Sequence, residues 1–197
     1  LISSHSLKFN YIIVIIMSSL LNLEASFDLA INQYHYKKDL IIIAGPTCVG
    51  KSLLALSLAK KINGVLINAD SVQVYKDLKL LSARPSEEDM RQIPHFLYGY
   101  VKSKKNYSIA DWLQQLSKVL LDIETKQQIA ILVGGSGLYL NAVINGLAPI
   151  PRLREKIKKQ SLFKMNEIGI DGFKELNFNI DPKFVAKNYD KHRLLRS

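Results

Sequence analysis

The sequence predicts an α/β fold in which helices flank a parallel sheet. Short, wholly apolar runs fit strands that are buried on both faces, and apolar residues recur at helical spacing between them. The order strand, helix, strand, helix, strand, with short connections, is typical of a doubly wound sheet. The predicted strands are LIIIA at 40–44, VLINA at 65–69 and IAILV at 129–133.

Start and stop signals define the helices of this sheet domain. Asn63-Gly64 ends the first helix, and Gly146 ends the third. Asp111 stands three residues after Ser108, which is the spacing of a capping box at the start of the second. The three helices are predicted over 51–62, 108–126 and 137–145.

The chain changes character at the proline-rich stretch 149–151. Residues 39–150 are predicted to form the sheet domain, and 151–197 a basic helical segment that is only part of a domain. Residues 1–38 form an N-terminal extension without an assigned role. Its apolar stretch, 11–23, is too short and too broken by serine for a membrane span, and it lacks the pattern of a signal peptide. We therefore expect no membrane association.

The charge balance is strongly basic. Lysine and arginine number 27 against 17 acidic residues, for a net charge of +10. This excess favours an anionic partner, with nucleic acid first and phosphate compounds second, although a basic solvated surface remains the alternative. Cys48 is the single cysteine, which excludes a disulfide framework and a cysteine-based metal site and suits the cytoplasm.

A phosphate-binding loop follows the first predicted strand. The stretch GPTCVGKS matches G-x-x-x-x-G-K-[ST] at every fixed position and precedes a predicted helix. Its glycines let successive backbone N–H groups converge on phosphate oxygens, and the helix adds its positive dipole end. Lys51 is expected to reach a terminal phosphate, and the Ser52 hydroxyl to bind Mg²⁺. The predicted binding residues are Gly45, Pro46, Thr47, Cys48, Val49, Gly50, Lys51 and Ser52.

The loop alone does not name a reaction. Most such loops serve a nucleoside triphosphate, and in those proteins an apolar strand usually ends in an aspartate that holds the metal. Here the strand at 129–133 ends in GGSG, while Asp70 follows the second strand, at the sheet edge where ligands bind. A small-molecule or nucleotide kinase that uses ATP is one reading, and a non-catalytic remnant that binds phosphate or RNA is another.

Further motifs follow in order and are more specific. They are NADSVQVY at 68–75, SARPS at 82–86, IPH at 93–95, YSIADW at 107–112, VGGSGLYL at 133–140, GLAPIP at 146–151 and DKHRLLR at 190–196. With the phosphate-binding loop, they resemble the tRNA dimethylallyltransferase (tRNA isopentenyltransferase) family from about residue 40 to the end. SARP stands where that family has Thr-Ala-Lys-Pro, and Ser136 where it usually has threonine.

The resemblance implies a reaction and its catalytic residues. A dimethylallyl group would pass from dimethylallyl diphosphate to the exocyclic N6 amine of the adenine beside the tRNA anticodon, with Mg²⁺ offsetting the diphosphate charge. Lys51 and Arg154 would stabilise the departing pyrophosphate. Ser136 would donate to the bridging oxygen as it gains charge. Asp70 would accept the amine proton as a general base.

The resemblance also assigns the contact with tRNA. The block formed by Asp70, Ser71, Val72 and Gln73 would bind the RNA, with Ser71 and Gln73 reading the adenine and its neighbour. Glutamine suits adenine because its amide presents a donor and an acceptor together. The base must leave its stack to reach the site. The basic stretch 152–159 is either a second tRNA contact or a solvated helix face.

Structural roles compete with these assignments. Asp70 could cap a turn after its strand, and Ser136 could be a loop residue chosen for size. Gln73 and Tyr75 could be surface or packing residues. His95 is expected to support the fold through a buried hydrogen bond rather than to take part in chemistry.

The ends of the chain point to a truncated family member. The sequence begins at Leu1, with Met17 as a candidate start, and stops soon after the element at 190–196. The resemblance implies a longer helical domain that grips the anticodon stem. We therefore expect a monomer with weak or absent activity on its own.

Overall fold

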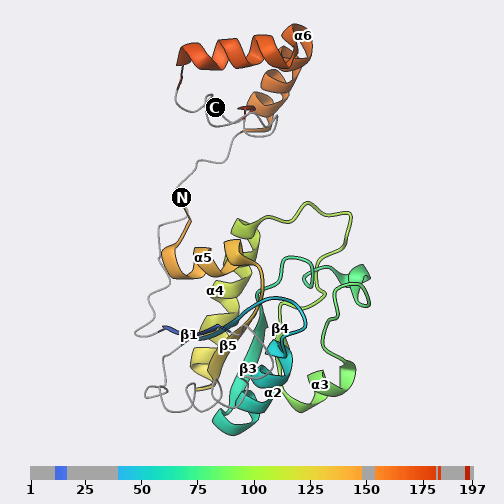
Figure 1. The fold of residues 1–197 in the computed structure, drawn as a ribbon, viewed down its shortest axis with the longest axis vertical. Coiled ribbons are helices and arrows are strands. Elements are labelled where there is room, and N and C mark those ends of the chain that lie inside the picture. The colour runs from blue at the N-terminus through green and yellow to red at the C-terminus, as the bar shows by residue number, and fades with distance from the viewer. Residues whose placement is uncertain (1–11, 17–39, 148–153, 181, 183–193, 196–197) are drawn as a thin grey trace. The chain divides into compact units, whose positions relative to one another are not determined.

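The computed structural model describes residues 12–16, 40–147, 154–180, 182 and 194–195 (Figure 1). The chain divides into two compact units, Leu1–Leu147 and Ala148–Ser197. The predicted boundary at 149–151 and most of the N-terminal extension lie outside the described residues. Each unit is therefore considered by itself.

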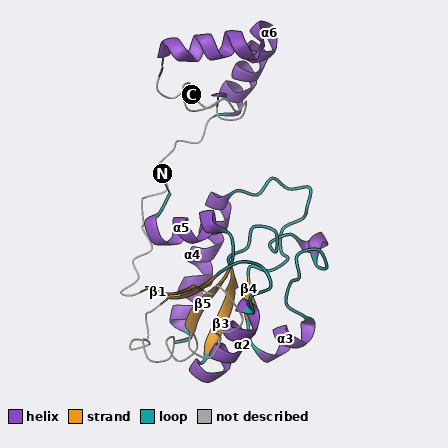
Figure 2. Cartoon of the chain, viewed as in Figure 1, coloured by secondary structure: helices purple, strands orange, loops and turns teal. Residues whose placement is uncertain are grey.

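A parallel sheet forms the centre of the first unit (Figure 2). Its strand order is β1-β2-β5-β3-β4, and every pairing is parallel. The three predicted strands are confirmed, with β3 shifted one residue toward the N-terminus and β5 one residue longer. The described strands are β1 (Ile12–Ile16), β2 (Leu40–Ala44), β3 (Gly64–Asn68), β4 (His95–Phe96) and β5 (Ile129–Gly134).

Two of these strands were not predicted. β1 lies in the N-terminal extension and pairs with β2, with Ile12 opposite Leu40. Its sequence, IIVII, is β-branched throughout, which favours an extended chain. β4 has only two residues, beside Leu66 and Ile67 of β3. So short a strand leaves no periodic pattern to detect.

Helices cover both faces of the sheet. Because successive side chains of a strand point to opposite faces, Ile41 and Ile43 pack toward α2 (Lys51–Ile62), whereas Leu40 and Ile42 join the cluster that contains Trp112. That second cluster includes α4 (Ile109–Thr125) and α5 (Gly137–Asn145). The strand residues of β2, β3 and β5 are almost entirely buried, as their apolar sequences predict.

Capping boxes fix the starts of two helices. At α4, Ser108 accepts from the Asp111 N–H while the Asp111 carboxylate accepts from Ser108, which confirms the predicted box. The same reciprocal pair, Ser86 and Asp89, begins α3 (Glu87–Gln92). These boxes satisfy backbone N–H groups that a helix start otherwise leaves unpaired.

The described part of the second unit is mainly helical. α6 (Glu155–Ile180) is interrupted at Gly169, whose φ of 73° breaks the helical path. Met165 and Phe173, one on either side of this break, pack with Leu194. The predicted helix starts at Asp181 and Asp190 lie outside the described residues. In the part of the chain that is described, no helix is long and apolar enough to cross a membrane.

The carboxyl ends of β3 and β5 approach each other very closely. A Cβ on Gly134 would lie 2.2 Å from the Ala69 carbonyl oxygen, which is far inside contact distance. The Ala69 N–H donates to the Val133 oxygen at 2.8 Å, and the Ser136 N–H donates to the Ala69 oxygen at 3.3 Å. Only glycine allows this approach at position 134.

We therefore expect Gly134→Ala to separate these strand ends and to destabilise the first unit by about 1–3 kcal/mol or more, the usual range for overpacking. Urea unfolding followed by circular dichroism measures the change. Gly137→Ala is the matched control, because a Cβ there meets nothing within 4 Å and alanine favours the helix by about 1 kcal/mol. Equal midpoints for the two variants would contradict the steric argument.

Candidate active site

The loop predicted to bind phosphate connects β2 to α2, which is the strand–loop–helix context that its motif requires. Gly50 is the N-cap of α2 and has a left-handed φ of 87°, and Cys48 also has a positive φ of 66°. Because Gly50 has no side chain to cap the helix, the first N–H groups of α2 are left to a ligand or to water. Pro46, Thr47 and Cys48 are exposed on the loop.

The Lys51 side chain folds back onto the loop that precedes it. Lys51 Nζ donates to the Pro46 carbonyl at 2.5 Å. Burial lowers the pKa of the Lys51 ammonium, and the negative charge of Asp70 opposes that shift. Lys51 and Asp70 follow different strands, β2 and β3, at the same edge of the sheet. Ser52 is exposed in the first turn of α2.

Asp70 is held in the turn that follows β3. Its Oδ1 accepts from the Val72 N–H at 2.8 Å and from the Gln73 N–H at 3.4 Å. The turn-capping role that competed with catalysis is therefore present. Among the described residues, no hydrogen bond involves the second oxygen, Oδ2. One carboxylate oxygen therefore fixes the side chain in the turn, and the other takes no part in it.

Ser136 joins the ends of β5 and β3. Its Oγ accepts from the Ser71 N–H at 2.8 Å and donates to Ser71 Oγ at 3.2 Å. Ser136 is the N-cap residue of α5, yet its side chain makes no cap hydrogen bond to that helix. Its hydroxyl instead bonds Ser71, in the turn that holds Asp70. A residue chosen only for its small size would not need these bonds.

Asn68 is an organising residue to which the sequence assigned no role. It is completely buried, and its Oδ1 accepts from the Asp70 N–H at 2.8 Å. Its Nδ2 donates to the carbonyls of Asp70 and Leu97, at 2.9 and 3.1 Å. Trp112 Nε1 donates to the Asn68 carbonyl at 3.1 Å. A polar residue that ends an otherwise apolar run was the signal that could have identified it.

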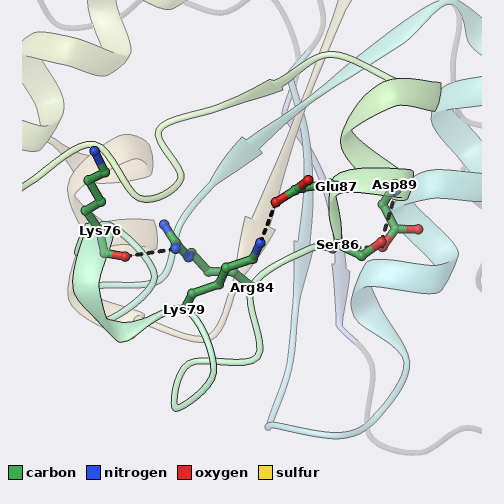
Figure 3. Close-up of polar contacts among 6 residues, drawn as sticks. All are labelled: Lys76, Lys79, Arg84, Ser86, Glu87 and Asp89. Atoms are coloured by element: carbon green, nitrogen blue, oxygen red, sulfur yellow. Dashed lines mark hydrogen bonds and ion pairs between the residues drawn. The ribbon is translucent and has the colours of Figure 1, made fainter.

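Gln73 is bonded to the loop that follows it. Its side-chain Nε2 donates to the Ser82 backbone carbonyl at 2.8 Å, and the backbone carbonyl of Gln73 accepts from the Gly99 N–H at 2.9 Å. Arg84 closes the base of this loop by donating from Nη2 to the Lys76 carbonyl at 3.0 Å (Figure 3). Among the described residues, the amide oxygen of Gln73 makes no hydrogen bond, and its predicted contact with a base stays a prediction.

The other predicted residues have simpler settings. Val72 is exposed beside Ser71, which is also exposed. His95 is half-buried, its Nδ1 lies 2.7 Å from the Ile93 carbonyl, and burial lowers its pKa, which agrees with the predicted structural role. Arg154 belongs to the second unit, where it is exposed just before α6. Its contact with pyrophosphate therefore stays a prediction.

We expect Asn68→Ala to destabilise the first unit by about 1–3 kcal/mol, because the part-buried Leu97 carbonyl and the Asp70 backbone lose their partners. Chemical denaturation measures this loss. Asn141→Ala is the control, since Asn141 is exposed on α5 and bonds only Asn145 among the described residues. Its cost should stay within about 0.5 kcal/mol. A similar cost at both positions would argue against Asn68 as the organiser of the turn.

Comparison with known proteins identifies one family. The family model described as IPP transferase matches residues 73–197. The chain is 48% identical to the tRNA dimethylallyltransferase of Allorhizobium ampelinum, with 81% of this chain and 53% of the relative covered. It is 42% identical to that of Hyphomonas neptunium, with coverages of 80% and 50%. The chain thus spans about half the length of these curated relatives.

Solved structures agree with the sequence matches. A eukaryotic dimethylallyltransferase, described as acting on tRNA, superposes with a TM-score of 0.68 at 30% identity, over 80% of this chain and 40% of that one. The tRNA isopentenylpyrophosphate transferase of Bacillus halodurans gives a TM-score of 0.54 at 34% identity, over 80% and 53%. The α/β architecture predicted from the sequence is therefore confirmed.

Proposed function

Because the chain belongs to the IPP transferase family, we propose that it carries the catalytic site for transfer of a dimethylallyl group to tRNA. The donor is dimethylallyl diphosphate, and the acceptor is the N6 amine of the adenine beside the anticodon. One observation carries the proposal: the phosphate-binding loop, Ser136 and Asp70 follow three neighbouring strands, β2, β5 and β3, at the same edge of the sheet. The names of the relatives support the reaction.

The diphosphate binds at the start of α2. Its oxygens accept from the loop N–H groups, and the Lys51 ammonium, now held on the Pro46 carbonyl, turns to the departing pyrophosphate. The described residues hold no group of three or more His, Cys, Asp or Glu side chains that could bind a metal. Ser52, exposed in the first turn of α2, would hold Mg²⁺ through its hydroxyl. When bound, Mg²⁺ offsets the negative charge of the diphosphate.

The transfer is a substitution at the allylic carbon. The adenine N6 forms a bond to that carbon while the carbon–oxygen bond to the diphosphate breaks, and the electron pair leaves with the diphosphate. Asp70 takes the proton from N6 through the oxygen that is not engaged in the turn. Ser136, whose 3.2 Å bond to Ser71 Oγ is long, redirects its proton to the bridging oxygen as it gains charge.

The kinase reading gains no support. Neither the matched family nor the relatives described above are kinases. β5 ends at Gly134 and is followed by Gly135 and Ser136, so no carboxylate takes the metal-holding place of a nucleotide hydrolase. We also infer a cytoplasmic location, which the single cysteine supports.

We expect Asp70→Asn to lower the single-turnover rate of prenyl transfer to an anticodon stem-loop by about 10²- to 10⁴-fold, the usual contribution of a general base. The amide oxygen can still accept from the Val72 N–H, so the turn and the diphosphate site should persist. Thermal stabilisation by dimethylallyl diphosphate measures that binding and should match the wild type.

Asp89→Asn is the matched control, because Asp89 also accepts backbone hydrogen bonds but lies in the capping box of α3. Its transfer rate should be unchanged. Loss of both binding and transfer in Asp70→Asn would remove Asp70 as the base. Stabilisation of the wild type by ATP, but not by dimethylallyl diphosphate, would overturn the proposal in favour of a kinase.

A further inference from the structure

We propose that six exposed residues beside the site bind the single-stranded RNA that flanks the modified base. This inference rests on the proposed function and names the part of the chain that grips the substrate strand. The lysines supply contacts for phosphates, and two leucines supply an apolar wedge against the bases. We call this set the lysine–leucine surface, and it consists of Lys76, Leu80, Leu81, Lys102, Lys104 and Lys105.

Direct contacts bring its two segments together. Asp77 Oδ2 accepts from the Ser103 N–H at 3.1 Å and from Ser103 Oγ at 2.7 Å. The Lys76 N–H donates to the Val101 carbonyl at 2.7 Å. The serine bonds also lower the pKa of Asp77, so its carboxylate remains ionised and engaged. The turn at 102–105 is therefore fixed beside the loop at 76–84.

The lysines of this surface are solvent-exposed. Lys76, Lys102, Lys104 and Lys105 all lie outside the core, and none of them forms an ion pair among the described residues. Lys79 differs, because it pairs with Glu87 at 3.0 Å (Figure 3). Exposed lysines that converge from two segments make an electrostatic footprint suited to a phosphate backbone.

Two leucines form the tip of the loop. Leu80 is 94% exposed and Leu81 is 87% exposed, the highest values among the large apolar side chains of the described residues. A single exposed leucine needs no explanation, but an adjacent pair on a fixed loop does. Ser82 holds the loop by donating from both N and Oγ to the Leu78 carbonyl, at 3.0 and 2.6 Å.

The loop is also connected to the residue proposed to read the adenine. Gln73 Nε2 donates to the Ser82 carbonyl, next to Leu81 in the chain. An adenine must leave its stack before its N6 can react, and unstacking is unfavourable. Apolar side chains that insert between neighbouring bases partly unstack them in other nucleic-acid complexes. Leu80 and Leu81 are placed to do so on the same loop that orients Gln73.

The lysine contribution is tested by salt-dependent binding of the chain to a fluorescent anticodon stem-loop. We expect Lys104→Gln/Lys105→Gln to weaken binding several-fold and to reduce the slope of log K against log salt by about 1 to 2, since each lost phosphate contact removes about 0.7. Lys60→Gln/Lys118→Gln removes the same charge from exposed positions on α2 and α4 and should leave both quantities near the wild type. Equal losses in the two pairs would overturn the assignment.

The leucine contribution is tested with 2-aminopurine beside the target adenine, because its fluorescence rises on unstacking. We expect Leu80→Ser/Leu81→Ser to abolish most of the rise that the wild type produces. The control Leu121→Ser/Ile144→Ser changes side chains that are 64% and 47% exposed on α4 and α5 and should retain it. If the leucine variant changes only the oligomeric state, the tip joins two copies of the chain and the proposal fails.

Thermal stabilisation by dimethylallyl diphosphate separates this inference from the proposed function. If the wild type binds diphosphate and RNA, and the variants bind RNA equally well, the lysine–leucine surface is refuted while the proposed function stands. A wild-type chain that binds diphosphate but not the stem-loop also refutes the surface. A wild-type chain that binds neither removes both.

Discussion

The approach of Gly134 to Ala69 is the constraint on which the rest of the site depends. With no Cβ in the way, the backbones at the ends of β5 and β3 come into direct contact. That contact places Ser136 against Ser71, and so beside the turn that holds Asp70. The carboxyl ends of parallel strands lie at one edge of the sheet, but a shared edge alone does not bring the loops that follow them into contact. Gly134 allows the loops after β5 and β3 to be joined by hydrogen bonds.

Asp70 shows how a side chain proposed to act in catalysis can also be structural. A carboxylate has two oxygens, and the turn uses one of them, while the buried Asn68 fixes the backbone on either side. The proposed base is therefore held in one orientation, and its ordering entropy is lost during folding rather than during a reaction. The structural and functional readings of Asp70 are compatible, because each needs a different oxygen.

Sequence patterns predicted the regular elements better than the connections. The wholly apolar runs of β2, β3 and β5 and the box at Ser108 leave local signatures, and the structure has each of them. The glycine-rich motif correctly predicted a loop between a strand and a helix. β4 is too short for a periodic signal, and β1 was read only as an apolar stretch. Asn68 and Arg84 act through partners far along the chain or on loop carbonyls. Such bonds depend on the folded arrangement, which no local pattern encodes.

The net positive charge of the chain indicates a binding partner only when the positions of the basic residues are considered. A net charge of +10 fits a solvated surface as well as it fits an RNA partner, because exposed charges are screened beyond about 8 Å at physiological salt. Lysines on distant helices therefore add little to the binding of one RNA strand. Lys102, Lys104 and Lys105 differ, since the Asp77–Ser103 bonds hold their turn beside the loop that orients Gln73. Position rather than total charge argues that this part of the surface meets the substrate.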